Sequence, residues 1–338
     1  LSAPLNFGSF QLVPYAWGEV AGWSNDFTHD SLSRLVGSAG MRGSIMFSKS
    51  MPDVRSRIFN LNGLNHKMIF DVDWSITESN RSLSLIPQWN EFDDNAQERF
   101  RQRLLVNTFG GALPPQFDPR NFAVRSGAGS SVTAPYHELV DDLHVIRFGW
   151  RHRWQTKVGP PERLRIKDWM TLDLDASLFP NAKRDDFGQT LGLLGARYAW
   201  HVGDRTSVLS NAYYDLFGGA MQLWNVGVLN QRSTRGSIYA GVRQVKGQGF
   251  RSEIFTTSAS YAMSDKWIST VGTAYDLAEG RNRGQSLTLT RVGADFLIHL
   301  GANVDASKNN FGLGISVEPR FGPFNSQSTQ LSNLLGIR

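Results

Sequence analysis

The stretch "RLRIKDWMTLDLDASLF", residues 163–179, decides the fold because apolar and polar side chains alternate along it. Its even positions are apolar and its odd positions are charged or polar, with Asp168 and Trp169 as the exceptions. Successive side chains of a β-strand point to opposite faces, whereas a helix would bring residues three and four apart together. We therefore predict a strand with one apolar face and one ionic face.

The triplet Asp173-Leu174-Asp175 within this stretch allows a second interpretation, as a carboxylate pair that holds a divalent metal ion. One strand offers too few oxygen ligands for such a site. On a strand, both carboxylates would lie on the ionic face, where arginine or lysine on neighbouring strands could pair with them. We expect this second arrangement and no metal site.

The same alternation recurs in most of the chain. Residues 67–77 place Met68, Phe70, Val72, Trp74 and Ile76 opposite Lys67, Asp71, Asp73 and Thr77, and residues 144–155 place Ile146, Phe148, Trp150 and Trp154 opposite Arg147, Arg151 and Arg153, with Val145 as an exception. Further strands are predicted at 9–23, 33–48, 190–200, 206–216, 222–229, 236–243, 251–261, 267–277, 286–292, 296–304 and 310–321, with residues 286–304 forming either a tight hairpin around Gly293 or one bent strand. Helical periodicity is best at 91–105. The pattern predicts an all-β protein of about fourteen strands.

Composition narrows the class of protein. The 338 residues carry a formal net charge of +5 and no cysteine, which excludes disulfides, thiolate metal sites and thiol nucleophiles within this sequence. Lysine and arginine are scattered among acidic residues, so no nucleic-acid partner is expected. No run approaches the ~18 apolar residues of a membrane helix. The sequence starts at Leu1 without a signal peptide, and we expect it to be part of a longer polypeptide.

Alternating strands of this length are typical of a transmembrane antiparallel β-barrel, whose strands cross a bilayer with ~9 to 11 residues. Tight turns at 201–205 and 263–266 contrast with longer connections at 180–189 and 277–285. Aromatic side chains gather at strand ends, as in the interfacial girdles of such barrels. We predict an outer-membrane β-barrel over residues 1–321, with 78–142 as a long loop or insertion and 322–338 as a C-terminal tail.

The cost of charge in lipid fixes which face of the barrel points outward. An arginine or lysine against lipid near the bilayer midplane costs about 2 to 4 kcal/mol. The ionic face should therefore line the lumen, with Asp71, Asp73, Arg147, Arg151, Arg153, Lys167, Asp173, Asp175 and Arg197 as lumen-lining residues. These charges could guide a phosphorylated glycolipid or simply balance one another, and the sequence leaves both alternatives open.

No catalytic constellation is present. The sequence has neither HExxH nor GxSxG, and the glycine-rich stretch 37–44 lacks the Lys-Ser/Thr ending of a phosphate-binding loop. We expect no enzymatic activity and no cofactor.

The last predicted strand carries two further features. Asn310, Gly312, Ile315, Val317 and Phe321 are similar to the terminal signal by which outer-membrane barrels are recognised by the barrel-assembly machinery. Pro319 in the same strand cannot donate a backbone hydrogen bond, which lowers the cost of parting it from a neighbouring strand. If residues 310–321 form the last strand, we expect this end of it to part from its neighbour more easily than the rest of the strand.

Several strings resemble the outer-membrane LPS-assembly protein family (LptD, or organic solvent tolerance proteins), and in particular its planctomycete-type members. They are "LVPYAWGEVAGW", "NLNGLNHKMIFDVDW", "VTAPYHELVDDLHVIRFGWRHRWQTK", "DWMTLDLDASLFPNAKRDDFGQTLGLL", "WHVGDRTS" and "GADFLIHLGANVDASKNNFGLGISVEPRF". The chain departs from the family in having no separate jellyroll and no cysteine, so it resembles the C-terminal barrel portion only.

This resemblance implies a large barrel that receives lipopolysaccharide from a periplasmic bridge. It implies release of the lipid into the outer leaflet through a lateral gate between the first and last strands, and we predict that Pro319 belongs to this gate. Implied partners are lipopolysaccharide or a related glycolipid, outer-membrane lipid and periplasmic LPS-bridge proteins, and a plug lipoprotein is left open. A diffusion porin or substrate-specific channel needs the same strands and stays an alternative. A soluble sandwich or lectin-like binding protein is the third.

Overall fold

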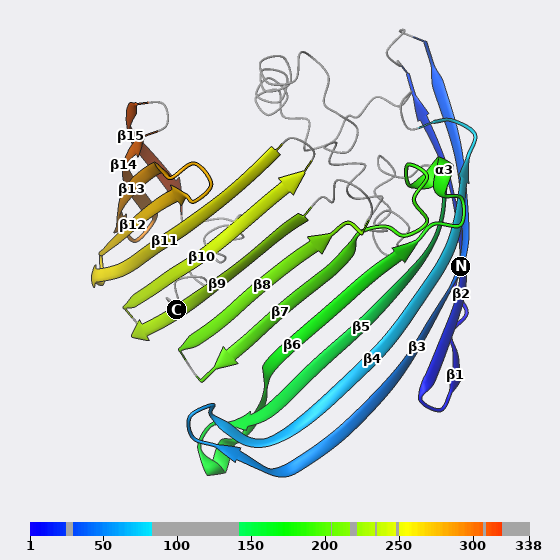
Figure 1. The fold of residues 1–338 in the computed structure, drawn as a ribbon, viewed down its shortest axis with the longest axis horizontal. Coiled ribbons are helices and arrows are strands. Elements are labelled where there is room, and N and C mark those ends of the chain that lie inside the picture. The colour runs from blue at the N-terminus through cyan, green and yellow to red at the C-terminus, as the bar shows by residue number, and fades with distance from the viewer. Residues whose placement is uncertain are drawn as a thin grey trace. The chain divides into compact units, whose positions relative to one another are not determined.

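The computed structural model describes residues 1–24, 30–82, 142–203, 205–216, 222–233, 235–247, 250–306 and 309–319. In these ranges the chain is almost entirely β-structure, and Figure 1 shows its strands from β2 in blue to β15 in red. The strands are β1 (Leu5–Phe7), β2 (Phe10–Trp23), β3 (Leu32–Ser56), β4 (Leu61–Ser79), β5 (Leu143–Val158), β6 (Arg165–Leu178), β7 (Leu194–Val202), β8 (Thr206–Tyr214), β9 (Gln222–Ser233), β10 (Gly236–Gly247), β11 (Phe250–Ser264), β12 (Trp267–Asp276), β13 (Arg281–Val292), β14 (Phe296–Asp305) and β15 (Asn310–Pro319).

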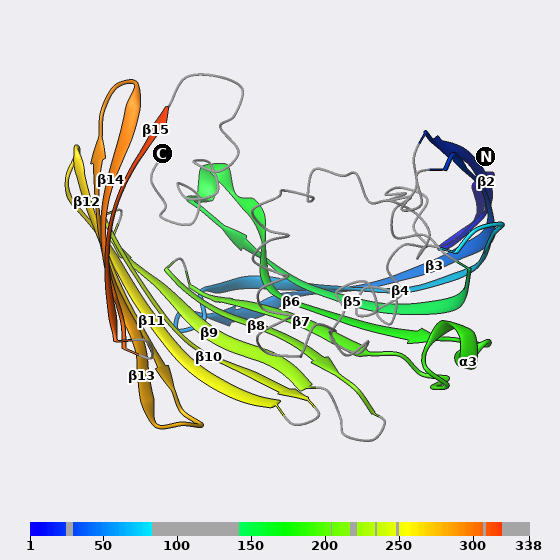
Figure 2. The same ribbon diagram turned by 90° about the horizontal axis from the view of Figure 1, so that it is seen from above.

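The strands form one 15-stranded antiparallel sheet in which every strand is hydrogen-bonded to its neighbours in the sequence. The predicted all-β, antiparallel class is confirmed. Strands β2 to β15 correspond one by one to the predicted strands, and the additional strand is the three-residue β1, which pairs with the start of β2. In the turned view of Figure 2 the strands β8 to β11 again follow one another in chain order.

Contacts divide the described chain into two compact units that share strands β3 to β7. The first unit is Leu1–Phe47, Met68–Arg151 and Leu174–Gly195, and the second is Ser48–Lys67, His152–Asp173 and Ala196–Arg338.

Several predicted strand boundaries were wrong, and β9 and β10, for example, each continue four residues past their predicted ends. Strand β3 runs on to Ser56 although residues 49–56 lack alternation, and β4 starts at Leu61. The expected long connection 277–285 is a tight turn, because β13 already begins at Arg281. Strand β7 begins at Leu194 because Thr190 and Gly192 bond back to the end of β6, with Phe179 N–H donating to the Thr190 carbonyl at 2.7 Å.

The connection after β6 contains α3 (Ala182–Asp185), and a short 3-10 helix η4 (Pro161–Arg163) precedes β6. Asp185 accepts a 3.0 Å hydrogen bond from the His144 backbone N–H at the start of β5. Its carboxylate also binds Arg184 at 2.6 Å, and this hydrogen bond raises the pKa of the Arg184 guanidinium. Nearby, Leu143, Val145 and Phe179 form a buried apolar cluster. The connection that contains α3 is thus fixed to the start of β5.

Among the described residues, no helix is long and apolar enough to cross a membrane. The predicted helical segment 91–105, most of the predicted insertion 78–142, Phe321 and the predicted tail 322–338 lie outside the described residues.

Candidate functional site

In a soluble protein, large apolar side chains of a sheet are usually buried and charged side chains are exposed. The two faces of this sheet show the reverse. In the first unit Arg34 is 1% exposed, whereas its neighbour Leu35 on the other face of β3 is 56% exposed. In the second unit, Leu313 and Ile315 of β15 are 76% and 75% exposed. We call the face that carries Leu35 and Leu313 the apolar face, and the other the ionic face. The apolar face therefore turns its large side chains outward while the ionic face is covered in part.

Asp73 is the centre of the ionic face in the first unit. Its carboxylate accepts hydrogen bonds from the Tyr15 hydroxyl at 2.8 Å, from Arg42 Nε at 3.2 Å and from Arg147 Nη2 at 2.7 Å. The guanidinium of Arg42 also lies over the Tyr15 ring, 4.8 Å from its centroid. One aspartate thus ties together β2, β3, β4 and β5.

A second group in the same unit centres on Arg151 of β5. Its Nη2 lies 2.5 Å from Asp175 of β6, and its Nε lies 3.5 Å from Asp71 of β4. Position 149 on β5, which faces the Asp71 carboxylate, is glycine for a steric reason, because an added Cβ there would overlap this carboxylate. The predicted residues Asp71, Arg151 and Asp175 are thereby brought together.

In the second unit Asp173 holds the equivalent place. Arg153 binds its two carboxylate oxygens at 2.6 and 3.2 Å, and Arg197 of β7 lies 3.9 Å from it. Asp173 and Asp175 therefore each face arginine, and within the described ranges no group of three acidic or histidine side chains could hold a metal ion. Lys167 is half-buried in β6 and, of the described residues, has no partner for an ion pair.

The sign of the charges alternates from strand to strand. On the ionic face β3 contributes Arg42, β4 contributes Asp71 and Asp73, β5 contributes Arg147, Arg151 and Arg153, β6 contributes Asp173 and Asp175, and β7 contributes Arg197. Each charge has the opposite charge on the adjacent strand, which is the favourable cross-strand arrangement. The ladder of alternating charges links neighbouring strands within each unit. Which arginine pairs with which aspartate was not predictable from sequence, because it depends on register.

The exceptions to the alternation have local explanations. Asp168 accepts a 2.8 Å hydrogen bond from Gln155 of β5, and the Trp169 indole donates to the Phe59 carbonyl at 3.0 Å. Val145 is apolar at an ionic position because it is fully buried against Phe179. Each exception therefore marks a place where another segment contacts the strand.

Two tyrosines lie over glycines on the ionic face, a feature that the sequence analysis missed. Tyr15 faces Gly40, where an added Cβ would come within 2.5 Å of the tyrosine ring. In the second unit Tyr239 extends over Gly227 and Gly241 in the same way. Side-chain packing of this kind explains why glycine interrupts strands that otherwise favour larger residues.

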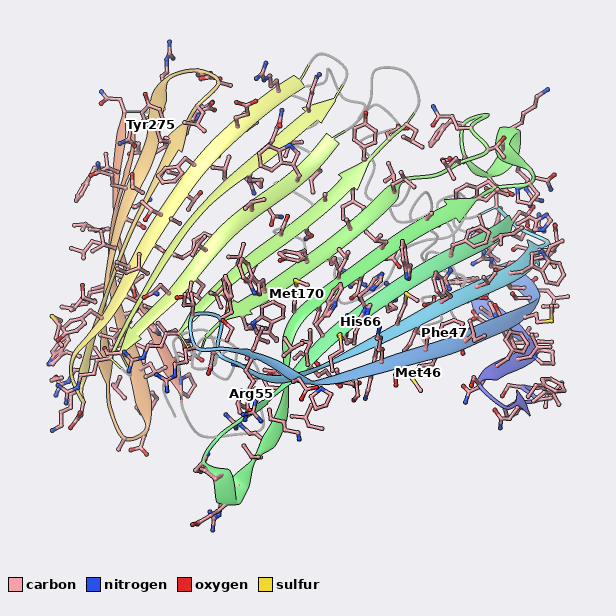
Figure 3. The ribbon with its side chains drawn as sticks, turned by 60° about the horizontal axis from the view of Figure 1, so that its bottom comes forward. Met46, Phe47, Arg55, His66, Met170 and Tyr275 are labelled. Atoms are coloured by element: carbon pink, nitrogen blue, oxygen red, sulfur yellow. The ribbon has the colours of Figure 1, made fainter. Side chains whose placement is uncertain are left out.

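Aromatic side chains and histidines pair on the apolar face. In the first unit Phe70 contacts Phe47 and Trp150, with ring centroids 6.3 and 5.4 Å apart. In the second unit His66 Nε2 lies 2.9 Å from His152 Nδ1 in near-parallel rings, and Trp154 lies parallel to both. Figure 3 shows Phe47 on β3 and His66 on β4. The bond between the imidazoles satisfies polar atoms on a face that is otherwise apolar.

The end strand β15 contains Pro319 of the predicted gate and the predicted signal residues except Phe321, which lies outside the described residues. Ile315 pairs with Leu300 and Val317 with Ile298 on the apolar face, whereas Gly312 pairs with Asn303 on the other. Asn310 and Pro319 are the first and last residues of the strand. These positions place Pro319 at the end of the sheet order, beside Phe296 of β14.

Comparison with known proteins gave only distant structural likeness. No family model and no curated protein matches the sequence. Among solved structures, two engineered variants of the porin from Rhodopseudomonas blastica are similar at 11% and 10% identity, with TM-scores of 0.36 and 0.34, over 91% of this chain and 98% of theirs. A structure described as "Asymmetric conductivity of engineered proteins" is similar at 11% identity and a TM-score of 0.35, over the same shares. At these values the likeness carries no argument for function.

Proposed function

We propose that this chain forms the wall of an outer-membrane β-barrel, with the apolar face against lipid and the ionic face toward a water-filled lumen. The observation that carries the proposal is the contrast between buried Arg34 and exposed Leu35 on successive positions of one strand. Exposed rows of large apolar side chains are rare on soluble proteins and mark contact with lipid or another apolar partner. In lipid, the ladder hydrogen bonds of paired strands satisfy the backbone.

The finer function that we propose is transport of lipopolysaccharide or a related glycolipid to the outer leaflet. Its support is the resemblance of the quoted strings to the LptD family, which brings the periplasmic bridge proteins and the barrel-assembly machinery as proposed partners. In this proposal the ion pairs that Asp73, Asp173 and Asp175 form with arginine on neighbouring strands keep the wall rigid while the lipid headgroup passes. The protein acts as a transporter without chemistry of its own.

Pro319 has a defined role in this proposal. It ends β15, pairs in register with Phe296 and offers no N–H to β14 or to any strand beyond. We expect that Pro319→Ala, which restores a donor, slows export and leaves folding intact. The measurement is surface glycolipid together with sensitivity to large antibiotics. Val317→Ala is a matched control one pleat away, because it changes apolar area and adds no donor. Unchanged export in Pro319→Ala would remove the gate role.

The membrane proposal is tested by single cysteines, each of which is unique because the chain has none. Fluorophores at Phe148 and Leu172 should be quenched by spin-labelled acyl chains, and those at Arg151 and Asp173 by a water-soluble quencher. The reverse assignment, or dispersal of the protein in water without detergent, would overturn the proposal.

A diffusion channel is the alternative that the paired charges favour. Charges that neutralise one another across the wall do not have to bind a particular transported molecule. A stable single-channel conductance of the isolated chain in planar bilayers would support the channel. Export that depends on the bridge proteins, without such conductance, would support the lipid transporter.

A further inference from the structure

The last three strands carry a row of side chains centred on His299. His299 Nδ1 lies 2.9 Å from Thr290 Oγ1 on β13, and its Nε2 lies 3.7 Å from the Glu318 carboxylate on β15. Strand pairing puts Thr290 opposite His299 and His299 opposite Ser316, so these groups share one face. One imidazole therefore reaches from β13 to β15 across the strand between them.

The two nitrogens behave differently in the neutral and protonated imidazole. A neutral imidazole has one donor and one acceptor, whereas an imidazolium donates from both nitrogens. Only the protonated form can hold Thr290 and at the same time attract the Glu318 carboxylate by charge. At 3.7 Å the pair lies beyond a hydrogen bond and within an ion pair, so its strength depends on the charge of His299.

The surroundings leave Glu318 as the acidic partner. On the ionic face around His299 the described neighbours are Val292 of β13, Leu297 of β14 and Ser316 of β15, none of which titrates. Arg291 lies on the opposite face, where it contacts the Trp267 ring at 5.8 Å. The remaining charged groups nearby, Asp295 and Lys266, belong to turns.

Glu318 precedes Pro319, which has no backbone N–H, at the end of β15. We propose that His299 is a proton-operated latch, which binds the Glu318 end of β15 to the sheet in mildly acidic solution and releases it as the pH rises. The pair is an ion pair only while the imidazole is protonated and the carboxylate is ionised, so loss of the imidazole proton weakens the latch. The inference concerns strand opening and does not rest on lipid export.

Amide hydrogen exchange of residues 310–318 in the detergent-solubilised full chain tests the latch, after correction for the pH dependence of intrinsic exchange. Protection should be about two- to fivefold greater at pH ~5.5 than at pH ~7.5, the factor given by an exposed ion pair. Both His299→Gln and Glu318→Gln should abolish this difference. His201→Gln is the matched control, since His201 makes a similar 2.8 Å bond to Ser207 in another hairpin.

Two results would overturn the latch. One is equal protection of β15 at both pH values in the unchanged protein. The other is a pH difference that persists in either of the two variants, and Glu318→Gln keeps the test decisive should His299→Gln fail to fold. Loss of the difference in His201→Gln as well would show a general effect of histidine and count against the proposal.

Discussion

Tyr15 donates a 2.8 Å hydrogen bond to Asp73 across the full width of β3, and it can do so because Gly40 lies beneath its ring. Strands β2 and β4 are thus tied together by one side chain over the strand between them. The Tyr15 side chain is buried, and its hydroxyl is the donor of this bond.

Gly40→Ala tests this arrangement. The new Cβ would lie 2.5 Å from the Tyr15 ring and from the Trp74 carbonyl oxygen, so either the ring or the backbone must move. We expect a loss of about 1 to 3 kcal/mol in the free energy of unfolding, measured by urea titration in detergent. Gly37→Ala is the control, because an added Cβ there meets nothing within 4 Å. Equal stability of the two variants would contradict the packing described.

The charge ladder predicts rescue by exchange of charges. Arg153→Asp and Asp173→Arg should each lower stability, because each leaves like charges opposite one another on β5 and β6. The double variant restores opposite charges and should recover about 0.5 to 2 kcal/mol relative to the sum of the single changes. A double-mutant cycle of unfolding free energies measures this coupling. Additive losses would mean that the ladder contributes no specific pairing.

Leu300 and Gly301 lie on opposite faces of β14, so the effect of an introduced charge can be compared between the two faces. Leu300 is an exposed member of the apolar face, and the next residue, Gly301, pairs with Gly314 and has room for a side chain. Leu300→Arg should cost about 2 to 4 kcal/mol in lipid, whereas Gly301→Arg should cost much less. Unfolding in lipid vesicles compares them. A greater loss at Gly301 would reverse the assignment of the faces.

The apolar cluster beside α3 should be sensitive to truncation. Phe179 is fully buried with Val145 and Leu143, so Phe179→Ala should lower stability by about 3 to 5 kcal/mol. Phe187→Ala in the same connection is the control, because Phe187 is exposed. Thermal unfolding followed by tryptophan fluorescence separates the two. Similar midpoints would show that the cluster contributes little.

Alternation alone predicted the strands well because each face of this sheet meets a different environment. Residues 67–77 and 144–155 show it most clearly, and both fall inside β4 and β5. Residues 49–56 of β3 show no alternation of apolar and polar side chains, and the strand is maintained there by pairing with β4. The turn at 277–280 was missed for another reason. Asp276 accepts the N–H groups of Ala278 and Glu279 and binds Arg283, which closes a tight turn.

The residues of the candidate site were predicted from the sequence, but the side chains with which they interact were not. Parity placed Asp71, Asp73, Asp173 and Asp175 on one face, and the structure brings each to an arginine. Which arginine binds which aspartate depends on strand register, and a sequence without known turns does not fix register. The same reason hid the partners of Tyr15 and His299, which lie one or two strands away.

The strand-by-strand change of sign has a consequence for how such a wall could grow by gene duplication. Inserting one strand between β4 and β5 would set two strands of equal charge side by side and would also reverse the direction of every later strand. Inserting a hairpin, one strand of each sign, preserves both charge order and chain direction. Duplication events that enlarge this protein should therefore add strands in twos.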